Sequence, residues 1–548
     1  MEKRAFLAIA VSMFILLLYP YLTRKFYPQL KEAKAPTAYS QRELRPPTKE
    51  EEQKAGRPIE QTFLSEEKEF KFETGNYVIV SSNIGGIVKS IILKRYFDSG
   101  DKAPITLAKI TEPQEAIFFV LGLDDEIDKG LPFSVEQKPD KIAFSAKTQS
   151  GLKIDKEIIF HPDKYFLELE QKITNLTDKS LTLKYKVVGG SRITKLSQQD
   201  ELYVETIRSI SGKITHINLR GIKNSTALNG GQVDWVSLKN RYFSLILKPF
   251  VASAVIYSNK LSNNELQTGI ETAEFILQPA TSVTHKYLLY AGPNDYDEIR
   301  RLNLGLEDSL HLGFTGGIGK VLLLIMKFFQ RVVKNWGVAI ILLTFLINIV
   351  LYPLTFKSLK SMREMQALQP KIEALRIAYK NNPQKLNREI MELYKKHKIN
   401  PMGGCLPILL QMPVFFALYQ VLMRSIELRG APFLWIRDLS QPDRLIVFNF
   451  SIPWFGKELN ILPILMAGSM FLQQKLSTPK RTALQGTVDQ YAQQQKMMAI
   501  MMPLMFGVLF YHLPSGLVLY WFTNTLLTMA EQGIFLRKYL FHVEHSET

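Results

Sequence analysis

Residues 335–426 read NWGVAIILLTFLINIVLYPLTFKSLKSMREMQALQPKIEALRIAYKNNPQKLNREIMELYKKHKINPMGGCLPILLQMPVFFALYQVLMRSI. They contain an apolar span, a basic segment and a second apolar span. The first span, residues 337–356, carries no charge and would be about 30 Å long as a helix, which is the thickness of the hydrocarbon core of a bilayer. We therefore predict that this span crosses a membrane.

Polar side chains recur inside this first span. Thr344, Asn348, Tyr352 and Thr355 follow one another at steps of four, four and three residues, so a helix places them on one face. Such a stripe must face protein or water, because lipid offers no hydrogen-bond partners. The stripe therefore predicts a wet or shared surface.

The segment after the span is strongly basic, which favours a cytoplasmic position by the positive-inside rule. Two apolar runs at helical spacing, separated by Asn381-Asn382-Pro383, predict an antiparallel hairpin of two amphipathic helices within residues 357–403. Its cations are candidates for contact with incoming chains, ribosomes or a targeting receptor, and a merely solvated helical pair is the alternative. The candidate contact residues are Lys357, Arg363, Lys371, Arg376 and Arg388.

Several motifs resemble a known family. The runs NWG…TF…YPLT, LQPKIEALR and NPMGGCLPILLQMPVFFALY, with PSGLVLYW at residues 514–521, are similar to the core of the YidC-type membrane protein insertases. These are the bacterial relatives of the mitochondrial and chloroplast oxidase-assembly insertases. The resemblance covers nearly the whole chain in the Gram-negative arrangement. It implies a periplasmic β-supersandwich like that of sugar-binding and sugar-epimerising proteins.

The composition fits a chain with a membrane part and a soluble part. The chain has 548 residues, of which 46% are hydrophobic, and a formal net charge of +17. The basic excess lies largely beside apolar spans, so anionic lipid headgroups explain it better than nucleic acid, and we expect no DNA partner. The single cysteine, Cys405, excludes an intrachain disulfide, and we expect it to be a small packing residue.

The N-terminal part predicts a membrane anchor and a tether. Residues 1–22 hold a long apolar run, and the one small-residue cleavage signal, Ala33-Lys34-Ala35, lies far downstream and precedes Pro36. We therefore expect an uncleaved transmembrane anchor with its N-terminus inside. Residues 23–61 are rich in Pro, Glu, Lys and Gln and predict a flexible linker.

Residues 62–312 predict a large antiparallel β-sandwich outside the cytoplasm. Apolar and polar residues alternate with period two, as in the segments 167–173, 181–187 and 283–289. Three histidines of this region have no recognisable spacing with Asp or Glu, so we expect docking or spacing rather than a ligand site. These histidines are His161, His216 and His285. The predicted turns are Gly85-Gly86, Gly189-Gly190 and Gly230-Gly231.

The remaining segments complete the predicted topology. Residues 313–335 predict an amphipathic helix on the outer membrane surface, with Lys320, Lys327, Arg331 and Lys334 on one face. Residues 336–356 are the second transmembrane helix, 404–536 hold four more, and 537–548 form a cytoplasmic tail. The expected fold is a polytopic α-helical protein of the cell inner membrane. It has six transmembrane helices, five of them in an insertase core, with both termini and the helical hairpin cytoplasmic and the β-sandwich periplasmic.

The chemistry expected of this core is not catalytic. It shows no nucleotide loop, zinc motif or nucleophile elbow, so we expect no enzyme, metal or cofactor. A hydrophilic groove open to cytoplasm and lipid would lower the barrier to moving a polar peptide into lipid. The same groups would alternatively bond one another between helices, for about 0.6 kcal/mol each. The candidate groove residues are Thr344, Asn348, Tyr352, Gln411, Tyr520, Thr523 and Asn524.

Two details qualify this groove. The family pattern places an arginine where this chain has Asn348, four residues before the Tyr-Pro-Leu motif, and the resemblance assigns that arginine to attracting acidic client segments. An asparagine supplies an amide without charge, so the groove should be polar and not fixed-positive. Methionines at Met497, Met501 and Met505 would suit contact with varied apolar clients, and core packing explains them equally well.

The leading hypothesis is a membrane protein insertase and chaperone that acts alone or with the Sec translocon. Its expected partners are nascent membrane proteins, the lipid bilayer, the ribosome, the Sec translocon and the signal recognition particle receptor. One alternative is a solute channel or transporter, which predicts related halves that the chain does not show. The other is a membrane-anchored periplasmic carbohydrate-binding protein.

Overall fold

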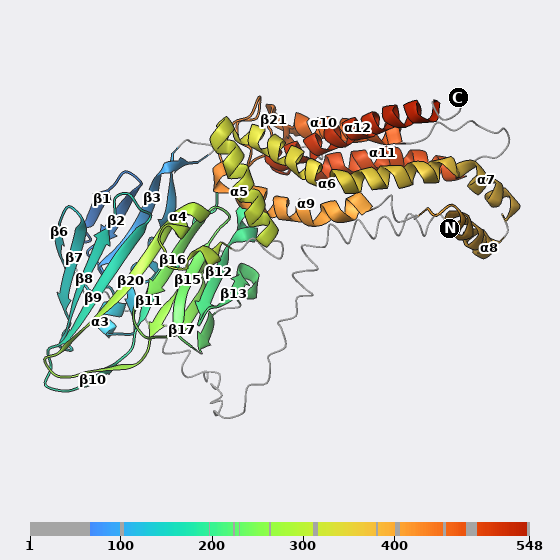
Figure 1. Cartoon of the computed structure of the whole chain (residues 1–548). Helices are drawn as coiled ribbons and strands as arrows, with labels where there is room; N and C mark the ends of the chain where they lie inside the picture. Colours follow the sequence, from blue (N-terminus) through green and yellow to red (C-terminus); the bar gives the residue numbers. More distant parts are fainter. Residues whose placement is uncertain are drawn as a thin grey trace. The chain divides into compact units, whose positions relative to one another are not determined.

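A computed structural model of the chain describes residues 66–98, 103–196, 198–222, 225–229, 231–261, 265–310, 316–379, 382–399, 406–452, 456–477 and 490–544. The predicted anchor, residues 1–22, and the linker, residues 23–61, lie outside this described part, as does Cys405. We call the described residues between 66 and 310 the β domain. Helices follow it along the chain (Figure 1).

The β domain is built on two large antiparallel sheets (Figure 1). The first has nine strands in the order β13 (Lys213–Asn218), β12 (Glu205–Ile210), β15 (Val233–Lys239), β16 (Phe243–Pro249), β20 (Ser282–Pro293), β9 (Phe166–Asn175), β8 (Leu152–Phe160), β7 (Lys141–Lys147) and β6 (Ser134–Gln137). The second has five strands in the order β14 (Ser225–Asn229), β17 (Ser253–Leu261), β18 (Glu265–Thr272), β11 (Lys186–Ser191) and β5 (Val120–Leu121).

Smaller elements complete the domain. A four-stranded sheet runs β1 (Glu69–Glu73), β2 (Tyr77–Ser82), β3 (Ile87–Phe97) and β4 (Pro104–Lys109), and β10 (Leu181–Leu183) pairs with β19 (Phe275–Leu277). The short helices are α3 (Asp125–Asp128), α4 (Tyr296–Arg300) and the 3-10 turns η1 (Pro113–Glu115), η2 (Gln198–Tyr203), η3 (Leu219–Gly221) and η5 (Glu307–Ser309).

The predicted alternation of apolar and polar residues is confirmed in β9. Leu167, Leu169 and Ile173 are buried on one side of β9, and Tyr287 of β20 is buried beside them. Inward residues of all the larger sheets join one continuous apolar core. Burial of such side chains stabilises the domain by about 25 cal/mol for each Å² of apolar surface removed from water.

The predicted turn at Gly189-Gly190 is wrong, because both glycines lie inside β11. A Cβ on Gly189 would lie 2.6 Å from the Leu247 Cβ of β16, and one on Gly190 would lie 3.2 Å from the Leu245 Cβ. The two glycines therefore serve close packing between the sheets and not chain reversal. Gly85-Gly86 does form a turn, between β2 and β3, and both residues have positive φ angles.

Eight longer helices follow the β domain among the described residues. They are α5 (Gly316–Val333), α6 (Trp336–Ala367), α7 (Gln369–Ala378), α8 (Pro383–Lys396), α9 (Leu406–Arg424), α10 (Ile461–Ser477), α11 (Gln490–Phe510) and α12 (Ser515–Glu544). Between α9 and α10 lie η7 (Ile426–Leu428) and a β-hairpin of β21 (Ile446–Ile452) and β22 (Gly456–Leu459), which the sequence had not indicated.

Helix α6 begins after a capping residue, Asn335, and ends later than predicted. The Asn335 side chain accepts a hydrogen bond from the Val338 N–H at 3.1 Å, which satisfies one of the free donors of the first turn. The helix continues through Pro353 and past Phe356 to Ala367, so its apolar span and the basic residues that follow form one element. By length and composition α6 is the only described helix fit to cross a membrane, and α11 holds a shorter apolar run, Ile500–Phe510.

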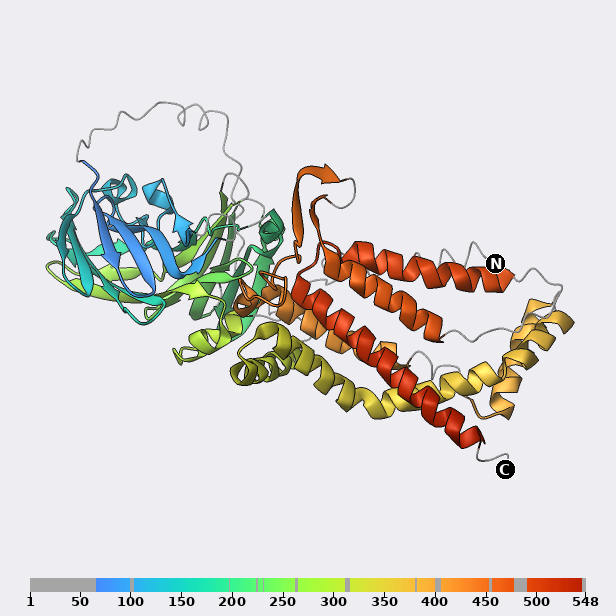
Figure 2. The ribbon, with the colours of Figure 1, turned by 90° about the horizontal axis from the view of Figure 1, so that it is seen from above.

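We call α5, α6 and α9 to α12 the helical core. Helix α12 packs against α10 and α6, α10 packs against α11, and α5 packs against α6 and α9 (Figure 2). Buried residues of α5, α6 and α9 to α12 form a second apolar cluster, separate from that of the β domain.

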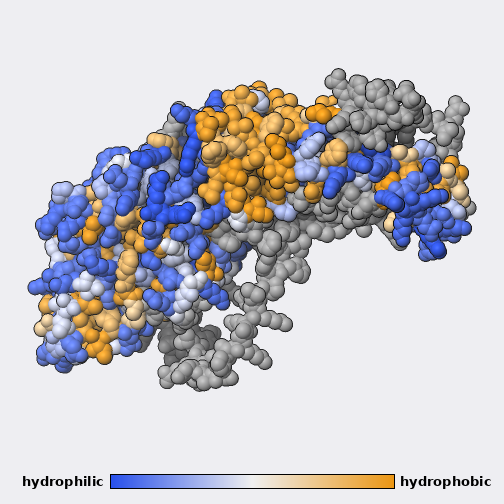
Figure 3. Space-filling model, in the orientation of Figure 1, coloured by the Kyte–Doolittle hydropathy of each residue, from blue (hydrophilic) through white to orange (hydrophobic). Residues whose placement is uncertain are grey.

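The outside of the helical core is apolar. Figure 3 shows hydrophobic side chains gathered over α5 and the start of α6, whereas α7 and α8 are largely hydrophilic. Large side chains such as Ile349 of α6, Phe328 of α5 and Leu504 of α11 are 60% or more exposed. A surface of this kind is stable in lipid and not in water.

Candidate functional site

The predicted polar stripe begins in the interior of the helical core. Thr344 is fully buried, and its hydroxyl donates to the Ile340 carbonyl one turn earlier at 2.7 Å. Asn348 is half-buried, and its amide donates to the Thr344 carbonyl at 2.8 Å and to the Asn524 Oδ1 of α12 at 3.0 Å. Tyr352 lies farther along α6 and is 45% exposed. The structure therefore brings the first part of the stripe against α12 and leaves Tyr352 at the surface.

A second polar pair connects α9 with α12. The Gln411 amide donates to the Tyr520 hydroxyl, and Tyr520 is 1% exposed. Thr523, one turn farther along α12, is also buried. Three helices thus meet through neutral amides and hydroxyls inside an apolar bundle. These groups donate or accept hydrogen bonds at no cost of burying a charge.

The three candidate methionines lie on α11. Met497 and Met501 are about half exposed, and Met505, one turn on, is partly buried. Helix α11 packs against α10 at Gly507, where an added Cβ would lie 3.1 Å from the Ala467 Cβ. Because the positions differ by four residues, the methionines share a face of the helix. That face therefore holds flexible apolar side chains that are partly exposed.

The candidate hairpin cations lie on three helices. Lys357 and Arg363 belong to the extension of α6, Lys371 and Arg376 to α7, and Arg388 to α8. The Lys371 Nζ lies 3.3 Å from the His397 Nε2, the Arg363 guanidinium donates to the Gln366 Oε1 at 3.0 Å, and the Arg388 Nε lies 3.1 Å from the Glu392 Oε1. A small apolar cluster of Leu368, Ile372 and Ile399 holds the hairpin together. Its polar surface therefore rests on very few buried contacts.

The β domain holds two histidine–carboxylate pairs that the sequence concealed. The His161 Nε2 lies 2.9 Å from the Glu168 Oε1, and the His216 Nδ1 lies 3.6 Å from the Glu205 Oε2. His161 directly follows β8 and Glu168 lies on β9, whereas Glu205 and His216 lie on the paired strands β12 and β13, so strand pairing and not sequence spacing brings these side chains together. Among the described residues, no group of three or more His, Cys, Asp or Glu side chains could hold a metal ion.

A further cluster lies where α5, α9 and the β domain meet. The Lys327 Nζ of α5 lies 2.8 Å from the Glu427 Oε1, 2.9 Å from the Asp297 Oδ2 and 3.2 Å from the Asp295 Oδ1. Burial favours the neutral form of Lys327, but the carboxylates outweigh it and raise the pKa of Lys327. The sequence placed Lys327 on a basic helical face and gave no sign of these partners, which lie up to 100 residues away.

The same junction contains a cavity of about 330 Å³. On its β-domain side the Arg241 Nε donates to the Met423 carbonyl at the end of α9. Lys239 is 5% exposed, and burial lowers the pKa of Lys239 to about 8. Both residues belong to the run VDWVSLKNRYF at residues 233–243.

Known proteins resemble the chain along its full length. The family described as 60Kd inner membrane protein matches residues 328–541, and the YidC periplasmic domain matches residues 69–325. A membrane protein insertase YidC of Pelobacter propionicus is 32% identical over 97% of this chain and 98% of its own, and one of Geobacter sulfurreducens is 32% identical over the same shares.

A solved structure is also similar to the chain. A crystal structure of an active YidC insertase with its first transmembrane domain resolved matches 85% of this chain and 92% of its own, with 20% identity and a TM-score of 0.35. The sequence relationships carry the assignment, since they extend over both the β domain and the helical core. The chain belongs to the YidC family of inner membrane protein insertases, which have a periplasmic domain and are not a family of enzymes.

Proposed function

We propose that this chain inserts membrane proteins into the inner membrane and assists their folding. A client span would enter along the polar face shared by α6, α9 and α12, open to cytoplasm and lipid, and leave sideways into the bilayer. The observation that carries this proposal is a pair of hydrogen bonds between helices, Asn348–Asn524 and Gln411–Tyr520. The outer surface of these helices is apolar. The relatives named insertases support the same function.

The proposed mechanism follows from the cost of unpaired backbone groups. An extended peptide in lipid leaves N–H and C=O groups unsatisfied at several kcal/mol each. Asn348 donates to Asn524 and Gln411 donates to Tyr520 across helices, and each of these groups can instead bond a client backbone. An exchange of partners of this kind costs little, because interhelical bonds of this type are worth about 0.6 kcal/mol. The polar face thus shortens the distance over which the client lacks partners.

The face carries no fixed charge at Asn348. An arginine would hold a carboxylate through a bidentate, charge-assisted pair, which an amide cannot form. Acidic client segments should therefore rely on hydration and on the membrane potential more than on attraction within the protein.

The topology and the partners complete the proposal. We infer six membrane spans with both termini and the α7–α8 hairpin in the cytoplasm, since α6 leads directly into the basic hairpin. The exposed cations of the hairpin would contact ribosomes, the signal recognition particle receptor and emerging chains. The methionine face of α11 would contact apolar client helices, alone or beside the Sec translocon. The curated relatives support neither a transporter nor a carbohydrate-binding protein.

Site-specific photocrosslinking tests the client path. A photoreactive residue at Asn348, Gln411 or Tyr520 should crosslink a stalled, ribosome-bound single-span client in inverted inner-membrane vesicles. Leu472 of α10 is 53% exposed and serves as the matched control on the lipid-facing surface. We expect crosslinks from the three polar positions and few from position 472. Silence at all three, with the client still inserted by this protein, would show that the polar groups only join the helices.

A further inference from the structure

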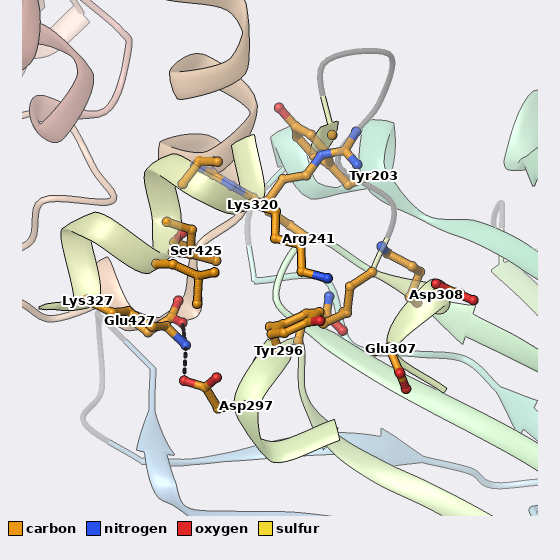
Figure 4. Close-up of a pocket in the computed structure, with 18 of the residues that line it drawn as sticks. Tyr203, Arg241, Tyr296, Asp297, Glu307, Asp308, Lys320, Lys327, Ser425 and Glu427 are labelled. Atoms are coloured by element: carbon orange, nitrogen blue, oxygen red, sulfur yellow. Dashed lines mark hydrogen bonds and ion pairs between the residues drawn. The ribbon is translucent and has the colours of Figure 1, made fainter. Parts of the chain in front are cut away.

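The cavity at the junction of α5, α9 and the β domain lies outside the proposed client path. Its volume is about 330 Å³. One wall is a face of α5 with Gly317, Lys320, Leu324 and Lys327, at helical spacing. Tyr203, Arg241 and Tyr296 form the facing wall (Figure 4).

Some charges of this cavity are already paired. Lys327 is bound by three carboxylates, as the dashed lines in Figure 4 show for Asp297 and Glu427. Glu205 lies 3.7 Å from the Lys239 Nζ and near His216. Burial opposes the charged form of Glu205, but the His216 hydrogen bond and the Lys239 charge lower the pKa of Glu205 to about 2. The charges of Lys327, Lys239 and Glu205 are therefore compensated within the protein and leave little charge for a ligand.

Arg241 and Lys320 have no carboxylate partner in the described part of the chain. Arg241 is 4% exposed, and its guanidinium lies over the rings of Tyr203 and Tyr242, 5.6 Å and 4.8 Å from their centroids. The Lys320 Nζ lies 4.5 Å from the Tyr296 centroid. Aromatic rings attract cations but do not neutralise them. Arg241 and Lys320 therefore present positive charge to the same cavity.

Two carboxylates of the cavity also have no ion-pair partner among the residues that the structure describes. They are Glu307 and Asp308 of η5. The Glu307 Oε2 is buried and accepts no hydrogen bond from any described residue. A buried carboxylate oxygen without a donor is costly and is normally satisfied by a ligand or by water. The cavity thus offers unpaired charges of both signs.

Exposed apolar side chains of α5 lie beside the cavity. Leu324 lines it and is 45% exposed, and Val321 and Phe328 on the same helix are 55% and 60% exposed. An amphipathic helix with such a face lies in the interface of a bilayer, with its apolar side chains among the acyl chains. A ligand with acyl chains could therefore place its headgroup in the cavity and its tails beside Leu324 and Phe328.

We propose that this cavity binds the headgroup of a phospholipid that carries a phosphodiester and a primary ammonium, in the periplasmic leaflet. Arg241 and Lys320 bind the phosphate, because a guanidinium fork and an ammonium are the usual donors to phosphate oxygens. Glu307 and Asp308 accept from the ammonium group. The bound lipid fixes the depth at which α5 and the β domain sit on the membrane surface.

Lipid binding to the full detergent-solubilised chain tests this site. Native mass spectrometry would compare dioleoyl phosphatidylethanolamine with dioleoyl phosphatidylglycerol at equal concentrations. We expect the wild type to retain the ethanolamine lipid, and Lys320→Gln or Arg241→Gln to weaken its binding by about tenfold, as the loss of a charged hydrogen bond predicts. Glu307→Gln with Asp308→Asn should abolish the preference between the two lipids.

The controls separate a specific site from adhesion to a basic helix. Arg331→Gln removes an exposed cation of α5 that does not line the cavity, and it should leave lipid binding unchanged. Arg241 also bonds the Met423 carbonyl, so its variant risks misfolding, whereas Lys320 is exposed and its variant keeps the test valid. Equal retention by Lys320→Gln and the wild type would refute the proposal. Displacement of the lipid by inorganic phosphate or glycerophosphoethanolamine at matched concentration would show a site for free phosphate compounds instead.

Discussion

Lys156 of β8 is a buried amine whose protonation should control the stability of the β domain. It is fully buried, and its Nζ donates to the carbonyl oxygens of Gly85, Phe118 and Gly86 at 2.7, 3.1 and 3.3 Å. Burial lowers the pKa of Lys156 from 10.5 to about 7. Between these two values the unfolded chain binds a proton that the folded chain does not, so the free energy of unfolding rises with pH.

We therefore predict that the melting temperature of the β domain rises from pH 7 to pH 9 and that Lys156→Met flattens this rise. Calorimetry of the detergent-solubilised chain at both pH values measures it. Lys153 lies on the same strand with a side chain 35% exposed, so Lys153→Met should keep the wild-type pH dependence. A pH dependence that survives in Lys156→Met would show that other groups cause it.

Asn348 sets the charge of the proposed client path. Asn348→Arg places a guanidinium beside Asn524, whose oxygen can accept from it. We expect clients with acidic translocated segments to insert with less dependence on the membrane potential, while neutral clients stay unchanged. Insertion into vesicles with and without an imposed potential measures this. Ile349→Arg puts the same charge on a side chain that is 67% exposed, and an equal gain from it would contradict a specific path.

At the scale of elements, the α7–α8 hairpin depends on one small apolar cluster. Ile372 of α7 is 2% exposed within that cluster, whereas Ile377 on the same helix is 71% exposed. Ile372→Asp buries an unpaired carboxylate or opens the hairpin, at roughly 3 kcal/mol. We predict faster amide hydrogen exchange throughout α7 and α8 and weaker ribosome binding. Ile377→Asp adds the same charge at the surface and should change neither, so equal effects of both variants would implicate charge instead of folding.

Local sequence patterns predicted several of these elements but not the contacts between distant segments. Period-two alternation placed β9 and β20, and Asn381-Asn382-Pro383 separated α7 from α8, because these signals are local. Gly189-Gly190 was mistaken for a turn, since a glycine pair in a packed strand has the same composition as one in a loop. The three partners of Lys327 come from α4, its cap and η7, and no local pattern announces a contact between distant segments.

At the scale of the whole molecule, Lys327 joins the β domain to the helical core. Asp295 and Asp297 belong to the N-terminus of α4, and Glu427 lies in η7 after α9. The Lys327 side chain is 9% exposed, and burial raises the pKa of Glu427, so the three carboxylates need this cation to stay close together. Removal of one partner from a buried ion pair usually costs about 3–5 kcal/mol.

Lys327→Met should therefore weaken the connection between the two parts while each part keeps its own apolar core. We predict that the thermal unfolding of the full chain, followed by calorimetry, separates into two transitions or shifts downward as a whole. Adding Glu427→Gln to Lys327→Met should recover part of the loss, because the buried charge left behind is removed as well. Arg331→Met takes an exposed cation from the same helix and should leave the unfolding profile intact. If Lys327→Met unfolds as the wild type does, the buried cluster contributes no net stability and the apolar contacts alone join the β domain to the helices.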